Sequence, residues 1–404
     1  MKKARWFPSK KQFAIIFFPV FLLFSFQISK AAELKLGPFE IHPYLQISEG
    51  FEDNVFRCEA CEKESDFFTL ITPGLQILLP DPNHHVLLEY RGDFSYYTNF
   101  DSENFDDNEV TGEYQGNLTP QLNITVKDHF LDGHDGREVT PLREIDFYFS
   151  NRADVEVGFT PLQGVSIQGG FGHFLLDFSG GGRNDFRDRS DLVFSGGATV
   201  DIISKTSALL EYSYTKAIYN EQSQSSTGNL NNGTHRVSPG LTWTPSKNSH
   251  GKVTAGYALK SFEDSAKDEF DTAIFSIFLE YVLPTKTKIS IRGGREVKEP
   301  DLDGQDFYIT TGGALDVSHP ILSVLEGSVS FSGGRESYYR EAPLTPGRKR
   351  KDNTYRIQTG FDYTPFPWLV AGIDYSFSNT DSNWFSNQFD YINHVVTLKV
   401  AVFN

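Results

Sequence analysis

The chain has 404 residues, a net charge of −16 at neutral pH, 14% aromatic residues and two cysteines. The acidic balance argues against nucleic acid as a partner, because binding to phosphates needs a basic surface. Two cysteines are too few for a disulfide-stabilised scaffold.

Residues 1–31 have the composition of a secretory signal peptide. A basic start is followed by an apolar run, Phe13 to Phe26, and Ser29 and Ala31 stand at the small-residue positions before a cleavage site. The alternative is a membrane anchor, but the run is shorter than the roughly 20 residues of a spanning helix. We therefore expect a signal peptide over residues 1–31 and a mature chain over residues 32–404. That chain either floats in the periplasm or crosses a membrane as strands.

The stretch from Asp66 to Asn99 reads as a β-hairpin with a tight turn at Pro80–Asn83. In its second run apolar and polar residues alternate, and a period of two indicates a strand with two different faces. The apolar parity holds Val86, Leu88, Tyr90, Phe94 and Tyr96, and the other parity holds Leu87, Glu89, Arg91, Asp93 and Ser95.

This alternation recurs along the whole chain, with short turns and longer polar loops in strict succession. Turns are expected at Pro80, Pro120, Pro161, Ser204, Pro245, Pro284, Pro320 and Pro365, and acidic loops near residues 57, 103, 137, 183, 226, 266, 302, 346 and 384. Short turns at one end and long loops at the other are typical of outer-membrane barrels. The pattern predicts an all-β, antiparallel up-and-down barrel of 18 strands, with 16 as the alternative. A large soluble β-sandwich is the competing interpretation.

Charged residues opposite the apolar parity are candidates to line the pore. They are Glu89, Arg91, Asp93, Arg152, Asp154, Glu211, Arg236, Lys260, Glu280, Arg292, Glu326, Arg356 and Asp374. Acids and bases on this parity are nearly balanced, which predicts a hydrated lumen without strong ion selectivity. Cross-strand pairing would explain these charges, and binding of a solute is the alternative. No loop is long enough to be an obvious constriction.

Aromatic girdles are expected from Tyr96, Tyr97, Tyr214, Tyr219, Trp243, Tyr363 and Trp368.

The sequence Gly-Gly-Arg-Glu occurs twice, at 293–296 and 333–336. Glycine permits a bend of the strand near the barrel rim. The alternative hypothesis is functional: Arg295 and Arg335 stand at the rim and meet an anionic polymer.

Cys58 and Cys61 form a C-x-x-C in the first loop. No thioredoxin-like unit, second cysteine pair or adjacent histidine accompanies them, so a surface disulfide is expected. We find no catalytic motif, cofactor motif or metal-ligand set in the sequence and expect no enzyme activity.

Phe51-Glu52-Asp53-Asn54-Val55-Phe56, then Ser65 to Phe68, Thr72 to Leu75 and Tyr96-Tyr97, resemble the opening of the putative β-barrel porin 2 family. That resemblance implies an outer-membrane barrel encoded with exopolysaccharide synthesis and export. An outer-membrane barrel is expected to contact outer-membrane lipid and lipopolysaccharide. The resemblance implies passage of polysaccharide, for which periplasmic polysaccharide-export components are candidate partners, and the oligomeric state stays open.

The leading functional hypothesis is a passive conduit for exopolysaccharide across the outer membrane. The alternatives are a general diffusion porin for small polar solutes and a structural barrel with a closed lumen.

Overall fold

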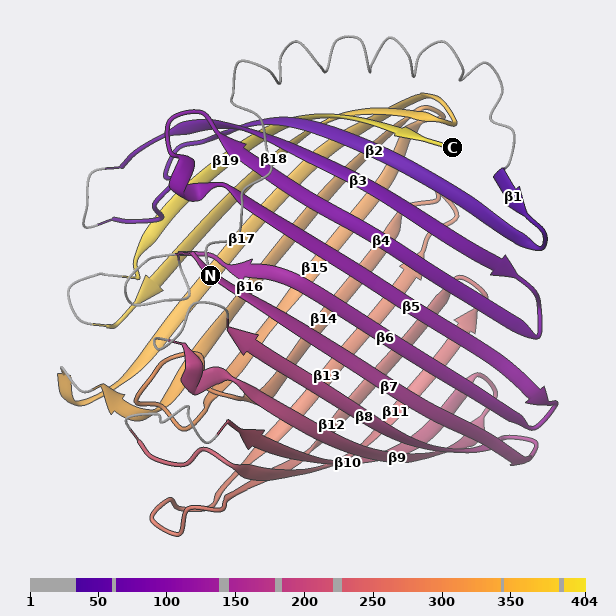
Figure 1. Cartoon of the computed structure of the whole chain (residues 1–404). Helices are drawn as coiled ribbons and strands as arrows, with labels where there is room; N and C mark the ends of the chain where they lie inside the picture. The colour runs from indigo at the N-terminus through magenta and orange to yellow at the C-terminus, as the bar shows by residue number, and fades with distance from the viewer. Residues whose placement is uncertain are drawn as a thin grey trace.

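The computed structural model describes residues 34–59, 63–137, 145–178, 184–220, 227–342, 345–384 and 389–404, with the backbone alone for 342, 345 and 346. Its single antiparallel sheet has 19 strands. The three-residue β1 (Leu34–Leu36) pairs with β2. The other 18 form a closed barrel, because β19 pairs with β2. Closure leaves no unpaired sheet edge. The predicted fold class and strand number are confirmed (Figure 1).

The barrel strands in chain order are β2 (Phe39–Glu52), β3 (Asp66–Pro80), β4 (His84–Tyr97), β5 (Phe105–Thr119), β6 (Leu122–Asp135), β7 (Asp146–Leu162), β8 (Val165–Phe178), β9 (Arg189–Ile203), β10 (Thr206–Tyr219), β11 (Asn232–Ser246), β12 (Ser249–Phe262), β13 (Phe270–Val282), β14 (Lys288–Lys298), β15 (Tyr308–Leu322), β16 (Leu325–Ala342), β17 (Thr345–Phe366), β18 (Leu369–Ser382) and β19 (Tyr391–Phe403). Two short 3₁₀ helices, η1 (Asp101–Glu103) and η2 (Asp185–Arg187), lie between strands. Among the described residues, no helix has the length and apolar character needed to cross a membrane.

The connections alternate between the two ends of the barrel, as predicted. We call the end that carries the β2–β3 and β14–β15 connections the loop end, and the opposite end the turn end (Figure 1). At the turn end, Asp81 Oδ1 accepts hydrogen bonds from the amides of Asn83 and His84, at 2.8 and 2.9 Å. This Asx turn reverses the chain between β3 and β4. The loop expected near residue 346 is instead the extended end of the β16–β17 hairpin.

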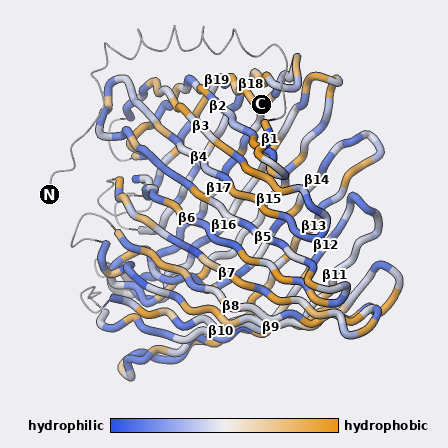
Figure 2. The backbone as a smooth tube through the Cα atoms, turned by 45° about the vertical axis from the view of Figure 1, so that its right-hand side comes forward, coloured by the Kyte–Doolittle hydropathy of each residue, from blue (hydrophilic) through white to orange (hydrophobic). Residues whose placement is uncertain are grey.

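The two faces of the wall differ in chemistry. Large apolar side chains on alternate positions are exposed, among them Phe331 on β16 and Leu398 on β19, and they belong to the outer face. Figure 2 shows hydrophobic and hydrophilic residues alternating along the strands. Such a large exposed apolar surface marks contact with lipid. The other parity faces the barrel interior, which we call the inner face.

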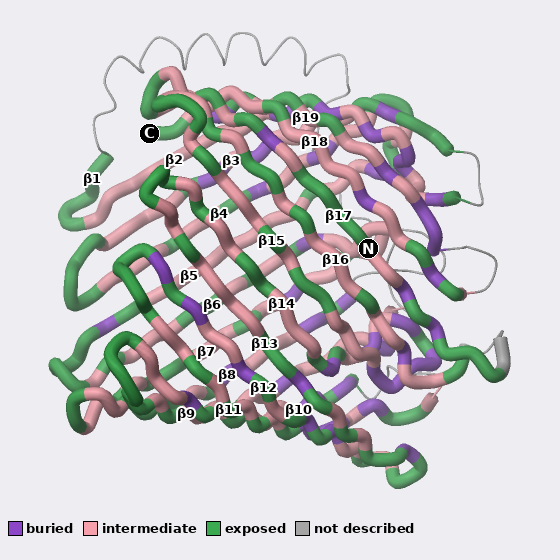
Figure 3. Tube along the Cα trace, turned by 180° about the vertical axis from the view of Figure 1, so that it is seen from behind, coloured by how far each residue is buried: buried purple, intermediate pink, exposed green. Residues whose placement is uncertain are grey.

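Buried residues gather toward the loop end (Figure 3). One buried cluster consists of Ala258, Ile274, Val297 and Phe307, and another of Ala217, Tyr219 and Leu230. Tyr219 lies on the inner face, so the prediction that it belongs to an outer aromatic girdle is wrong. Tyr97 is a second such case, because its hydroxyl donates to Glu52 at 2.7 Å. The loop end of the barrel is therefore filled by side chains that the strand pattern does not single out.

Residues 1–31 lie outside the described part of the chain, so the signal peptide remains a prediction. Cys61 also lies outside it. Cys58 is buried and disulfide-bonded.

Candidate functional site: the lumen and its loop-end constriction

The structure places every predicted pore-lining residue on the inner face. They lie on the parity opposite to the exposed apolar side chains of their strands, as Arg292 does to Ile291 and Asp374 to Ile373. This placement holds for Glu89, Arg91, Asp93, Arg152, Asp154, Glu211, Arg236, Lys260, Glu280, Arg292, Glu326, Arg356 and Asp374. These residues share the charged face of the wall, and their role in lining a conducting pore stays a prediction.

Most of these charges pair with neighbours on the same face. The ion pairs are Arg91–Asp93 at 2.9 Å, Lys127–Glu113 at 3.2 Å, Arg152–Asp154 at 2.8 Å, Lys252–Glu211 at 2.6 Å, Lys288–Glu280 at 3.1 Å, Arg292–Asp316 at 2.7 Å and Lys399–Asp374 at 2.9 Å. The side chains of Arg292 and Arg152 are 59% and 52% exposed, so water reaches them. Exposed pairs of this kind contribute about 0–1 kcal/mol each. These pairs balance the charge of the inner face, and their side chains stay in contact with water.

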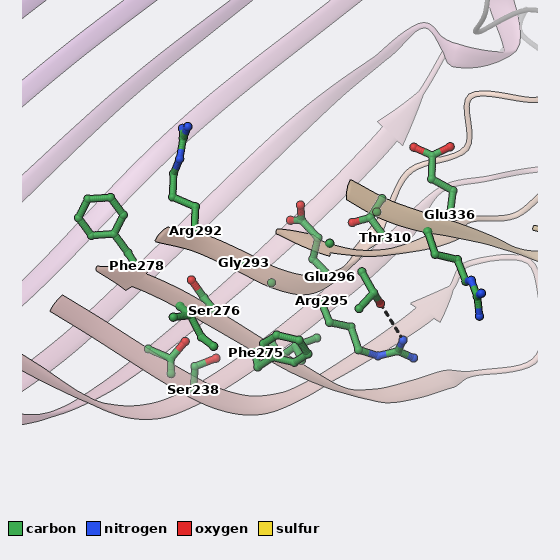
Figure 4. A pocket seen from close by; sticks show the side chains of 18 of the residues that line it. Ser238, Phe275, Ser276, Phe278, Arg292, Gly293, Arg295, Glu296, Thr310 and Glu336 are labelled. Carbon is green, nitrogen blue, oxygen red and sulfur yellow. Dashed lines mark hydrogen bonds between the residues drawn. The ribbon is translucent and has the colours of Figure 1, made fainter. Parts of the chain in front are cut away.

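Arg295 and Arg335, expected at the rim, lie on the outer parity. Figure 4 shows Arg295 directed away from the side on which Arg292, Glu296 and Glu336 project. The Arg295 guanidinium donates to Ala273 O at 3.1 Å and to Thr311 Oγ1 at 3.1 Å. Arg335 Nε donates to Asn353 Oδ1 at 2.8 Å. Both arginines are therefore held against the outer wall.

The end of β14 separates from β13 but stays paired with β15 as far as Lys298↔Tyr308. Pairing of β14 with β13 stops at Phe275↔Arg295, although both strands continue further toward the loop end. Beyond that point the Arg295 side chain, and not the β14 backbone, donates a hydrogen bond to the Ala273 carbonyl of β13. On the inner side, Arg236 of β11 donates to Val297 O at 3.4 Å, across two intervening strands. The end of β14 and residues 299–307 thus turn into the lumen. We call residues 297–307 the β14–β15 tip.

A buried ionic cluster holds the β14–β15 tip against the wall formed by β10, β11 and β12. Glu299 Oε1 lies 2.5 Å from Lys260 Nζ. Glu299 Oε2 accepts hydrogen bonds from Tyr219 Oη at 2.7 Å and from Asn232 Nδ2 at 3.0 Å. Lys260, 1% exposed, also donates to Asn232 Oδ1 at 2.8 Å. These four residues are the Glu299 cluster. Lys260 is therefore a structural lysine at the loop end rather than a wall charge in contact with water.

The other side of the tip is anchored on β16 and on the β12–β13 loop. Tyr338 Oη donates to Asp301 Oδ2 at 3.2 Å, and the backbone amide of Arg340 donates to Gln305 Oε1 at 2.8 Å. Asp306 forms ion pairs with Lys267 and Arg340. Phe307 is completely buried, and its ring lies 4.5 Å from that of Phe270. The tip is thus held between β10–β12 on one flank and β16 on the other. The sequence pattern did not indicate that this short connection enters the lumen.

The electrostatics of the Glu299 cluster favour its charged form. Burial by itself would raise the pKa of Glu299. The charges of Lys260 and Arg189, with hydrogen bonds from Lys260 and Tyr219, outweigh burial and hold that pKa at about 2. Glu299 therefore stays ionised, and the cluster stays closed, at any pH near neutrality.

No group of three or more His, Cys, Asp or Glu side chains with metal-binding geometry occurs in the part of the chain that the structure describes. Asp316 and Glu336 are among the inner-face acids that were missed from the sequence. Asp316 lies opposite Ser290 and Ser330 and pairs with Arg292. Glu336 lies opposite Thr310 and Asp352. Both carry the same alternation signal as their neighbours, so a complete reading of β15 and β16 would have found them.

A closed 18-stranded barrel with an apolar outer face and a hydrated, charged inner face defines an outer-membrane channel protein. The chain belongs to the putative β-barrel porin 2 family, whose model matches residues 30–404. Family and fold together place it in the bacterial outer membrane, where the outer face contacts lipid.

Several solved porins are similar in chain course. OpdO of Pseudomonas aeruginosa is 12% identical, with 90% of this chain and 97% of that chain covered and a TM-score of 0.47. OpdK of the same organism, solved with vanillate, is 9% identical, with 90% and 99% covered and a TM-score of 0.47. A BenF-like porin of Pseudomonas fluorescens Pf-5 is 10% identical, with 91% and 99% covered and a TM-score of 0.48. These similarities are too distant to transfer a ligand or a mechanism. No curated protein matches the chain in sequence.

Proposed function

We propose that the protein is a passive diffusion channel for small polar solutes. The observation that carries this proposal is the β14–β15 tip, which enters the lumen and is fixed there by the Glu299 cluster. Below the tip the wall charges are paired yet exposed to water. A hydrated tube with a narrowed mouth admits small solutes and restricts large ones.

The near balance of acids and bases in the wall supports a channel with weak ion selectivity. Ion pairs between neighbouring strands, such as Lys288–Glu280 at 3.1 Å, leave little net field along the lumen. Solutes would therefore be sorted chiefly by size and polarity. Membership of a porin family supports the same class of function.

Exopolysaccharide export is the less favoured function. It rests on the sequence resemblance alone, and the family description names no polymer. A wide polymer conduit would also need an open mouth, whereas the tip enters the loop end of the lumen, where Lys260 of β12 and Tyr338 of β16 hold it.

The test is single-channel conductance of the refolded protein in a planar bilayer, with and without alginate as an acidic polysaccharide. We expect a steady conductance of weak selectivity that the polymer does not change. Block of the current by alginate would favour polysaccharide export instead. Absence of conductance from folded protein would overturn both channel functions and leave a structural barrel.

A further inference from the structure

A groove of about 680 Å³ lies on the inner face over β13 to β16, next to the β14–β15 tip. Its lining includes Arg292, Gly294, Gly312, Gly334, Glu296 and Glu336 (Figure 4). Three of these are glycines in one lateral row, because Gly294 pairs with Gly312 and Gly312 pairs with Gly334. Along this row the surface of the groove is formed by backbone atoms, because the three residues have no side chains.

The wall leaves least room for a side chain at the centre of the glycine row. A Cβ on Gly312 would lie 2.8 Å from Gly333 O, so no larger residue fits there without a shift of the structure. A Cβ on Gly294 would lie 3.1 Å from Phe275 O, a tight contact, and one on Gly334 would lie 3.4 Å from Thr311 O, an ordinary contact. The strip without side chains leaves space for a ligand against the wall.

Opposite charges border the glycine row on its two sides. The next inner-face row toward the turn end holds Arg292, opposite Ala314, and Arg356, opposite Ser332. The next row toward the loop end holds Glu296 and Glu336, which both lie opposite Thr310. Arg292 and Glu296 are four residues apart on one strand, so their Cα atoms are about 13 Å apart. The glycine strip thus lies between a row with two bases and a row with two acids. Arg236 also lines the groove, on the loop-end side, where it donates to Val297 O at 3.4 Å and interacts with Glu296.

These charged groups retain capacity for a ligand. Arg292 uses one nitrogen for Asp316 and is still 59% exposed, and a guanidinium carries five donors. Glu296 pairs with Lys298 at 2.7 Å but is 54% exposed. Glu336 forms no ion pair with a lysine or arginine of the described chain, although it is partly buried and accepts a hydrogen bond from Tyr338. The hydroxyls of Thr254, Ser276 and Thr310 also line the groove.

We infer that this groove binds a small zwitterion, of the size of an amino acid or short peptide, as it passes through the channel. Its carboxylate lies toward Arg292 and its ammonium group toward Glu296 and Glu336, with its backbone over the glycine strip. Arg292 offers the paired donors that suit a carboxylate. A solute with one charge satisfies one side of the groove alone. The inference rests on the proposed channel function and names the solute class that it favours.

The test uses triglycine as the probe, with acetate and ethylammonium as probes of single charge. Triglycine is added to wild-type channels in a planar bilayer, and the duration of current blocks is measured. We expect triglycine to produce resolved blocks and the single-charge probes to produce none. Arg292→Gln and Glu336→Gln should each shorten the triglycine blocks about tenfold, the loss of one charge-assisted contact.

Arg152→Gln is the matched control, because Arg152 is an inner-face arginine of similar exposure, paired with Asp154 outside the groove. This variant should leave the triglycine blocks unchanged. Equal shortening in all three variants, or conducting channels that triglycine never blocks, would overturn the inference and leave the channel function standing. Channels that do not conduct would overturn the proposed function itself.

Discussion

Glu299 and Lys260 form a buried ion pair at 2.5 Å that joins the β14–β15 tip to the inner face of β12, 39 residues away in the chain. Neither residue belongs to a local motif, and each has the other as its main compensating charge. A buried ion pair contributes little more to folding stability than an apolar pair of similar size would. Removal of one partner nevertheless lowers the stability by about 3–5 kcal/mol, because the other charge stays buried without compensation. The position of the tip therefore depends on both residues being present.

Lys260→Met should release the tip, because it leaves the Glu299 carboxylate buried without its cation. We expect a larger single-channel conductance with more frequent fluctuations than in the wild type. Lys252→Met is the control, since Lys252 is an inner-face lysine of the same strand in an exposed pair with Glu211. If both variants conduct like the wild type, the tip does not limit the current.

The constriction should resist mild acid. The folded-state pKa of Glu299, about 2, lies below its ordinary value of 4.5. The stabilisation is therefore complete above about pH 5 and is lost as the pH falls from about 4.5 toward about 2. Single-channel current should stay constant from neutral pH to about pH 5 and change only in stronger acid. A conductance step between pH 7 and pH 5 would contradict the assignment.

The β8–β9 connection should respond to pH in the opposite sense. Burial raises the pKa of Asp188 to about 6, although the Phe178 amide donates to its Oδ1 at 2.8 Å. The protonated form is favoured in the fold, so this connection loses stability as the pH rises from about 4 to about 6. Asp188→Asn keeps the acceptor without the charge. We expect slower hydrogen exchange at Phe178 in the variant at pH 7, and equal rates would refute this explanation.

The two faces of the wall should tolerate charge differently. Phe331 is exposed on the outer face, and Ser332 follows it on the inner face. Phe331→Lys should cost up to about 2–4 kcal/mol in lipid, whereas Ser332→Lys should cost little. Resistance of the refolded barrels to urea in vesicles, read from heat-modifiable gel mobility, measures the difference. Equal losses would mean that the assignment of faces is wrong.

The strands, turns and inner-face charges could be predicted because their signals are local. Alternation sets the face of a residue such as Arg292, and the turn at Pro80–Asn83 fixes the register of β3 and β4. Antiparallel closure follows from an even number of strands, because the last strand then runs opposite to the first. These features need no information from distant parts of the chain.

The β14–β15 tip could not be predicted in the same way. Its short length suggested a plain connection, but it enters the lumen because β14 leaves β13 beyond Arg295. The partners of Glu299 include Tyr219, 80 residues earlier in the sequence. A long-range contact of this kind leaves no period or motif. The one signal was an acid directly followed by Pro300, at a point where the strand alternation stops.

The central claim is that the tip narrows an otherwise hydrated lumen. Its most direct test is the conductance of wild-type and Lys260→Met channels in the presence of polyethylene glycols of graded size. We predict that small glycols enter the wild-type channel and lower its conductance, that larger ones are excluded, and that the variant admits larger glycols. The same size limit in both channels, or entry of large glycols into the wild type, would contradict the claim.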